Sequence, residues 1–167
     1  MISNITGTDL VYNIVEELLT GSIDGVSITA QVVSGGRAGS KMKGVVNPLL
    51  ANNPYATGVK KMGTTPGGPT IMGKYHLKTH ESKQKWIRLV PFAENVMHGR
   101  AGFAIHGRGN RGSDGCIVPT DFNVVQSIYS LVEAREQANK PAPTLAVVAI
   151  GDFDYIDKKL KDIMQTA

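Results

Sequence analysis

The segment from residue 34 to residue 70 is rich in glycine and proline, which break helices and strands, so we expect it to be irregular. It contains the clusters Ser34-Gly35-Gly36, Asn47-Pro48, Asn52-Asn53-Pro54 and Pro66-Gly67-Gly68-Pro69. The whole chain of 167 residues has 19 glycines, which favours many short strands joined by loops. Because such a long irregular segment within one domain is usually functional or mobile, we expect it to matter for function.

Outside that segment, the hydrophobic pattern predicts a mixture of strands and helices. Residues 9–20 carry apolar side chains at helical spacing, so we expect an amphipathic helix there. Strands are expected at 26–32, 71–79, 85–91, 102–106 and 144–150, and helices at 121–138, capped by Thr120 or Asp121, and at 155–165. We expect one domain over 1–167, made of a helical segment (1–25), a β-rich catalytic core (26–120) and a helix-strand-helix unit (121–167). The expected fold is α+β and mainly β, with helices packed on a twisted, partly closed sheet.

The charge and the N-terminal sequence limit the classes of partner and location. A net charge of +4 and a pI of about 9.2 are mildly basic, but the basic residues are scattered, so we expect no nucleic-acid surface. No apolar run is long enough to cross a membrane. The first seven residues have neither a basic nor an apolar region of a signal peptide.

The single cysteine, Cys116, excludes an internal disulfide and a multi-cysteine zinc site. The four histidines show no zinc-ligand spacing, so we expect no metal and no cofactor. A lone cysteine is more often a small buried apolar side chain than a catalyst. Here, however, it follows a glycine-rich turn rather than standing in a periodic apolar segment.

Cys116 and His106 together suggest nucleophilic catalysis. An imidazole within hydrogen-bond reach can take the thiol proton and return it to a leaving amine. His106 ends a short apolar segment, and a glycine-rich loop separates it from Cys116, so the loop can bring the two side chains together. The amides of Asp114, Gly115 and Cys116 are candidates for an oxyanion hole. Arg108 and Arg111 lie nearby in sequence, and cations lower the pKa of a thiol.

Other polar residues have weaker claims. His98 is an alternative base, although its position before a turn favours the surface. His76 and His80 alternate with lysines, which is typical of a solvated strand face. Arg88 and Arg100 are candidates for holding a substrate carboxylate.

His106-Gly107 followed by Ser113-x-Gly115-Cys116 resembles the signature of the YkuD-type L,D-transpeptidases, which act on bacterial peptidoglycan. More narrowly, the chain is similar to the L,D-transpeptidase-like effectors of type VI secretion systems. The segments that match this narrower group, within residues 30–120, are Ser34-Gly35, Asn52-Asn53-Pro54, Gly68-Pro69, Gly73-x-Tyr75, Leu89-Val90-Pro91 and Gly99-Arg100-Ala101-Gly102-Phe103. The resemblance implies a YkuD-like twisted β-sandwich or partly closed sheet.

The resemblance also implies a reaction. Cys116 would attack the carbonyl of the L-centre of meso-diaminopimelate in a tetrapeptide stem and release D-Ala. His106 would be the general base and acid, the carbonyl of Gly107 would orient its ring, and Ser113 would shape the turn. The acyl group would pass to water, to a D-amino acid or to another stem. The substrate-binding residues we expect are Tyr75, Arg100, Phe103 and Arg108.

The sequence departs from the family's pattern in the same loop. The ten residues from His106 to Cys116 are fewer than is usual, and Asp114 stands where many members have histidine. Pro119 stands close behind the cysteine, and the arginine common there is absent. These changes affect the expected substrate contacts more than the nucleophile.

Two other readings stay open. One is a catalytically silent module that binds cell-wall stems. The other is a cysteine peptidase or amidase of another fold, such as the NlpC type. The latter places the cysteine before the histidine, which is the reverse of the order here. On the leading hypothesis the protein is made in the cytoplasm without a signal peptide and acts in the bacterial periplasm, with an immunity protein as partner. A contractile secretion apparatus, a phage or a lysed cell would deliver it.

Overall fold

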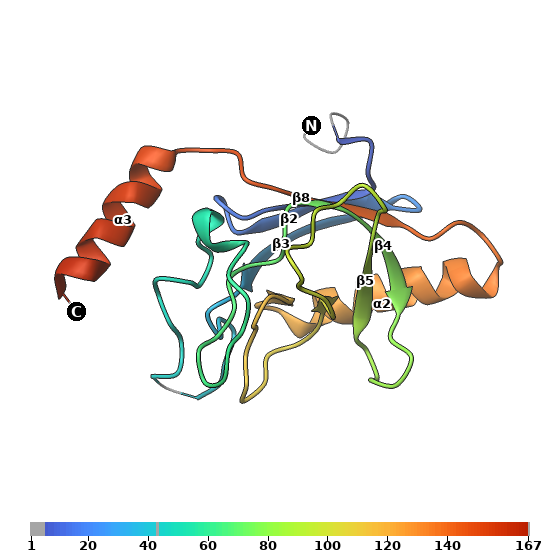
Figure 1. Ribbon diagram of the computed structural model, residues 1–167. Coiled ribbons are helices and arrows are strands. Elements are labelled where there is room, and N and C mark those ends of the chain that lie inside the picture. The colour runs from blue at the N-terminus through green and yellow to red at the C-terminus, as the bar shows by residue number, and fades with distance from the viewer. Residues whose placement is uncertain (1–5, 43, 167) are drawn as a thin grey trace.

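The computed structural model describes residues 6–42 and 44–166, and this part of the chain combines strands with helices (Figure 1). The strands are β1 (Leu10–Asn13), β2 (Leu18–Ile23), β3 (Val26–Ser34), β4 (Gly73–Thr79), β5 (Ile87–Pro91), β6 (Ala104–Ile105), β7 (Ile117–Pro119) and β8 (Thr144–Val148). The helices are α2 (Phe122–Gln137) and α3 (Phe153–Thr166), with one 3-10 turn, η1 (Pro54–Ala56). The expected α+β class is confirmed. Within the described residues, neither helix has the length and apolar character needed to cross a bilayer.

The strands form a closed barrel in the order β1-β2-β3-β7-β6-β5-β4-β8. The barrel closes because β8 pairs in parallel with β1 and antiparallel with β4. On the other side, the two short strands β6 and β7 join its halves through the parallel pair Ile105 and Ile117. The expected β-sandwich is therefore wrong, and the sheet expected to be partly closed is a fully closed barrel. Pairing that continues around the whole sheet leaves no free strand edge.

The helix expected at 9–20 is wrong; of the helical segment expected at 1–25, residues 1–5 lie outside the described residues. The chain forms β1 and β2 there and reverses between them, with Glu17 in the left-handed region at φ 57°. All four residues of β1 are buried, so the strand lacks the apolar-polar alternation that would have revealed it. Apolar residues that fill both faces of a short strand match a helical spacing by coincidence.

The other predicted elements are confirmed, with shifted ends. The strands predicted at 26–32, 71–79, 85–91 and 144–150 correspond to β3, β4, β5 and β8, and the helices at 121–138 and 155–165 to α2 and α3. The strand predicted at 102–106 shrinks to β6. Asp121 caps α2 by accepting a hydrogen bond from the amide of Asn123 at 2.9 Å.

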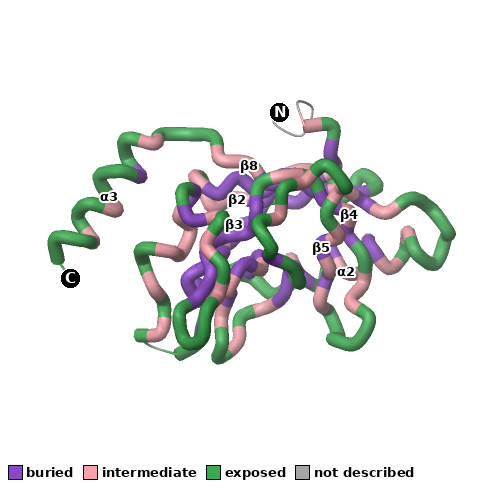
Figure 2. Tube along the Cα trace, in the orientation of Figure 1, coloured by how far each residue is buried: buried purple, intermediate pink, exposed green. Residues whose placement is uncertain are grey.

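The hydrophobic core fills the barrel and continues under α2, as the buried purple segments of Figure 2 show. The helix packs on β4, β5 and β7 through Val125, Ile128 and Val132, none of which is exposed. Arg135 near its end makes an ion pair of 2.9 Å with Asp24 in the turn before β3. The apolar face of α2 and this ion pair therefore hold the helix against the barrel.

Helix α3 stands away from the barrel, at the left of Figure 1, and only Ile156 in it is buried. It touches the rest of the chain near η1, where Tyr55 donates a hydrogen bond of 2.7 Å to Asp157 and packs against Phe153. The loops around Cys116 lie elsewhere. The segment after β3 runs beside the loop between β6 and β7 through the bridges Ala38–Ser113 and Ser40–Gly109.

Candidate active site

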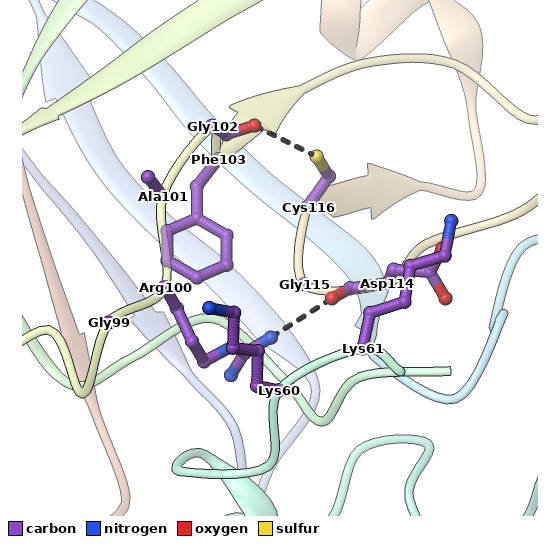
Figure 3. Close-up of a pocket in the computed structure, with 10 residues that line it drawn as sticks. All are labelled: Lys60, Lys61, Gly99, Arg100, Ala101, Gly102, Phe103, Asp114, Gly115 and Cys116. Atoms are coloured by element: carbon purple, nitrogen blue, oxygen red, sulfur yellow. Dashed lines mark hydrogen bonds and ion pairs between the residues drawn. The ribbon is translucent and has the colours of Figure 1, made fainter. Parts of the chain in front are cut away.

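Cys116 immediately precedes β7 and is half-buried in the wall of a pocket of about 220 Å³. Figure 3 shows its thiol pointing toward the carbonyl of Gly102, at 3.9 Å. The pocket is lined by Lys60, Lys61, Gly99, Arg100, Ala101, Gly102, Phe103, Asp114, Gly115 and Cys116. The sulfur thus borders a space large enough for part of a peptide.

His106 follows β6 directly and is buried. Its amide donates to the carbonyl of Ile117 at 3.1 Å, which continues the β6–β7 ladder. Nδ1 of the ring lies 2.7 Å from the carbonyl oxygen of Gly107. Since a carbonyl only accepts, Nδ1 carries the proton, and Nε2 of the neutral ring has a free lone pair. This is the tautomer that a general base needs.

His106 and Cys116 lie on the same side of the β6–β7 ladder. The paired residues Ile105 and Ile117 are fully buried in the core, so by alternation their neighbours His106 and Cys116 point the other way. In this register Cys116 stands opposite Ala104, one diagonal step from His106. In the described part of the chain, no hydrogen bond joins the thiol to the ring. A proton transfer therefore requires a side-chain rotation.

Ser113 organises the turn that presents the cysteine. Its buried hydroxyl donates to the carbonyl of Cys116 and accepts from the amides of Gly35 and Gly115, both at 3.1 Å. Because Gly115 donates to Ser113, its N–H is already used, which contradicts its expected place in an oxyanion hole. The amide of Asp114 is the other member of that expected pair.

Only glycine fits at position 115. Its φ is +145°, and a Cβ there would lie 2.3 Å from the ring of Phe103 and 2.6 Å from Arg100. Its carbonyl accepts from Ser34 at 3.2 Å and from Thr70 at 2.5 Å. The Gly-Cys step is thus held closely between the loop of 99–103 and the glycine-rich segment of 34–70.

Arg100 is a clamp rather than a carboxylate anchor. It is 6% exposed, and its guanidinium donates to carbonyls of the 57–69 segment, namely to Thr57 and to Pro69 and Gly68 at 2.8 Å each, and to the carbonyl of Asp114 at 2.9 Å. Few donors remain for a substrate. The carboxylate role expected for Arg100 is therefore wrong. Arg88 is likewise occupied, because it is paired with Glu81.

Two of the other three expected substrate contacts lie away from the pocket. Tyr75 is fully buried and donates to the carbonyl of Ile71 at 2.6 Å, so it cannot touch a substrate. Arg108 is exposed and borders a different hollow, with Lys41 and Phe122. Phe103 alone remains in place, as an apolar wall of the pocket. His98, the alternative base, is exposed in the turn before Gly99.

Burial sets the charge of both reactive groups. It raises the pKa of the Cys116 thiol, although the amide of Ala104 and the charge of Lys83 oppose this. Burial also lowers the pKa of His106, against its bond to Gly107 and together with the charge of Lys83. The resting pair is thus a neutral thiol and a neutral imidazole. Neighbouring cations do lower the pKa of the thiol, but they are Lys83 and Arg100 rather than the expected Arg108 and Arg111, and desolvation outweighs them.

Four functional candidates carry no signal in the sequence. Lys60 and Lys61 come from the irregular segment and stand at the pocket mouth, where Lys61 is 3.4 Å from Asp114 (Figure 3). Trp86 and Lys83 come from the hairpin between β4 and β5, where Trp86 stacks on His106 and Lys83 lies over the Trp86 ring. Only the folded chain brings these residues to the thiol.

No cluster of three or more potential metal ligands occurs in residues 6–42 and 44–166. Comparisons of the chain with family models, with curated proteins and with solved structures found no match.

Proposed function

We propose that this protein is a cysteine acyl-transfer enzyme in which Cys116 is the nucleophile and His106 the general base and acid. The observation that supports this best is the shared ladder. The thiol borders a pocket, and a buried imidazole with a free Nε2 lies on the same side of the same pair of strands. A catalytic pair of this kind needs a proton acceptor, not a preformed thiolate.

The reaction proceeds in two steps. Sγ of Cys116 bonds to the substrate carbonyl carbon while its proton passes to Nε2 of His106. The tetrahedral intermediate collapses as the C–N bond breaks, and His106 returns the proton to the leaving amine. Water or an amine then attacks the thioester, loses its proton to His106 and releases the thiol. With the Gly115 amide in use, the amides of Asp114 and Cys116 are the donors we assign to the oxyanion.

The pocket suits a peptide that carries a negative charge. Lys60, Lys61 and the buried Arg100 stand against one carboxylate, that of Asp114, so cations outnumber anions on its walls. Phe103 and Ala101 add an apolar wall. A stem peptide ending in a free carboxylate fits this combination.

From the motif around Cys116, we propose peptidoglycan tetrapeptide stems as the substrate. The activities would be an L,D-carboxypeptidase, an L,D-transpeptidase or a D-amino-acid exchange, each through the same acyl-enzyme. We further propose an antibacterial effector that is exported to the periplasm and neutralised in its producer by an immunity protein. Toxicity on periplasmic but not on cytoplasmic expression tests that assignment.

The experiment is mass spectrometry of muropeptides after incubation with the purified protein, with and without D-Met as acceptor. We expect D-Ala release from tetrapeptides, incorporation of D-Met if transfer occurs, and loss of both in Cys116→Ala. His106→Gln should reduce turnover by about 10²-fold or more, the usual contribution of a general base. Turnover by Cys116→Ala at the parent's rate would exclude the assigned nucleophile.

A binding module is the second candidate. The raised pKa of the thiol and the lack of a thiol–imidazole hydrogen bond in the described residues favour it. Isothermal titration of tetrapeptide into parent and Cys116→Ala separates the two functions. Equal binding with no turnover by the parent would establish the module, whereas turnover by the parent alone would establish the enzyme.

A further inference from the structure

The hairpin between β4 and β5 places an aromatic ring and a cation in a column on His106. The rings of Trp86 and His106 are stacked, with centroids 4.0 Å apart and an interplanar angle of 14°. Nζ of Lys83 lies 4.0 Å from the centre of the Trp86 ring. Since the imidazole already occupies one face of the indole, the ammonium lies on the other. The order of the column is therefore ammonium, indole and imidazole.

The hairpin holds the indole firmly. The amide of His80 donates to the carbonyl of Trp86 at 3.0 Å, and Nδ1 of His80 accepts from the amide of Lys83 at 3.1 Å. The ring of His80 meets the indole edge-on at 5.9 Å. The backbone of Lys83 and of Trp86 is thus tied to His80. Trp86 is a fixed wall rather than a freely moving side chain.

The column constrains the imidazole in two ways. Stacking restricts the plane of the ring, and the bond from Nδ1 to Gly107 restricts its rotation. The nearby ammonium of Lys83 disfavours a second positive charge on the imidazole. Trp86 also takes away water that would solvate the charged ring.

The other charged groups around the site act elsewhere. Arg88 on β5 is paired with Glu81, and Asp114 acts on the thiol of Cys116. Among the described residues, Lys83 is the charged side chain that acts on the His106 ring. The column is therefore the local control on the charge of the base.

We propose that Trp86 and Lys83 are positioning residues for His106, which hold its ring in one orientation and keep it uncharged, so that Nε2 is ready to accept the thiol proton. This assignment rests on the proposed function, in which His106 is the base. Neither residue touches the reacting atoms. Each acts through the imidazole.

The first test is an NMR titration of ¹³C-labelled histidine, with the His106 signal assigned from His106→Gln. Lys83→Met keeps the length of the side chain and removes its charge. We expect the His106 titration to move to higher pH in this variant. Lys85→Met is the matched control, because Lys85 is on the same hairpin and contacts the ring of Tyr129 instead, at 4.8 Å. A His106 titration that is the same in Lys83→Met, Lys85→Met and the parent would overturn the proposal for Lys83.

The second test compares Trp86→Phe with Trp86→Ala. Phenylalanine preserves a stacked ring, whereas alanine exposes the imidazole to water. We expect Trp86→Ala to move the His106 titration to higher pH and to lower kcat about tenfold, with little change in KM. In Trp86→Phe, we expect the His106 titration and kcat to stay close to those of the parent. A change confined to KM would mean that Trp86 binds substrate, and equal effects of the two variants would exclude a role for the ring.

The titrations need no turnover, so the two proposals fail separately. If the protein turns over no stem peptide but Lys83→Met shifts the His106 titration, the column is real and the proposed reaction is wrong. If turnover is observed and neither Lys83 nor Trp86 affects the titration or kcat, the reaction stands and the column has no positioning role.

Discussion

The guanidinium of Arg100 donates a hydrogen bond of 2.9 Å to the carbonyl oxygen of Asp114, two residues before the thiol of Cys116. The same side chain binds carbonyls of the 57–69 segment. One buried cation thus ties the turn before Cys116 to the 57–69 segment, part of which lines the same pocket. The shape of the site depends on a residue that itself has little access to substrate.

Arg100→Met should therefore destabilise the fold and disorder the pocket. Several buried carbonyls would lose their donor, and each unsatisfied group costs about 1–3 kcal/mol, so we expect a loss of at least about 2 kcal/mol. Urea unfolding measures the change, and Arg111→Met, at an exposed position in the loop between β6 and β7, is the control. A loss no greater than that of the control would show that the clamp is not needed.

Gly115→Ala should disrupt the site through strain. The residue would take a backbone conformation that favours glycine, and its methyl group would meet Phe103 and Arg100. We expect a cost of about 1–3 kcal/mol in the free energy of unfolding and altered reactivity of Cys116. Gly109→Ala is the matched control, because a Cβ at that position has open space. Equal stability of the two variants would contradict the close packing around position 115.

The thiol should react slowly at neutral pH without substrate. Because burial raises the pKa of Cys116, the rate of alkylation by iodoacetamide should continue to rise above about pH 8.5, the ordinary value for a free thiol. The measurement is labelling rate against pH, followed by mass spectrometry. A plateau near neutral pH would show that the resting state is a thiolate, contrary to the burial argument.

The acid side of the pH profile should depend on His106. Its pKa is lowered by burial, so the ring stays neutral and able to accept a proton below about pH 6.5, the ordinary value. The lowered pKa of His106 also makes the stability of the fold depend on pH. The unfolded state takes up the proton first, so the free energy of unfolding falls as the pH drops from about 6.5 through the lower folded pKa. In His106→Gln this contribution should be absent. Urea unfolding at several pH values between about 4 and 7, a range that brackets the ordinary histidine pKa, tests this.

Lys60→Gln should weaken recognition of a carboxylate without affecting the chemistry. Lys60 borders the pocket, and its removal leaves Lys61 paired with Asp114. We expect KM for a stem peptide with a free carboxylate to rise about threefold to tenfold at low salt, with kcat unchanged. The amidated peptide should respond less, and Lys158→Gln on α3 should have no effect. Equal changes for the free and the amidated peptide would exclude a charge contact.

Much of the secondary structure was predictable where the pattern was unambiguous. Helix α2 shows its apolar face and its cap at Asp121, and β3 alternates clearly. The failure at β1 has a physical cause. Its side chains are buried on both faces, because the strand lies between β2 and β8 in a closed sheet, and such a strand loses its alternation.

The site divides in the same way. The resemblance carried by the local motif implied two contacts that the structure contains: the bond from Ser113 to the carbonyl of Cys116, and the bond between His106 and Gly107. It misjudged Tyr75 and Arg100, because a side chain's exposure depends on what packs over it from distant segments. It missed Trp86, which stacks on His106 from the β4–β5 hairpin, and the two lysines of the pocket, which come from a loop that shares no motif with Cys116.

The sequence by itself determined the chemistry available to this protein: one thiol, a histidine ten residues ahead of it, and a turn before the thiol that requires glycine. Only the tertiary structure decided the protonation states of the thiol and the imidazole. Closing the barrel buries the thiol and the imidazole together, and burial sets both as neutral groups because charge is costly away from water. Closure also brings the 57–69 segment and the β4–β5 hairpin to the site, since contacts between segments distant in sequence arise only when the whole core packs.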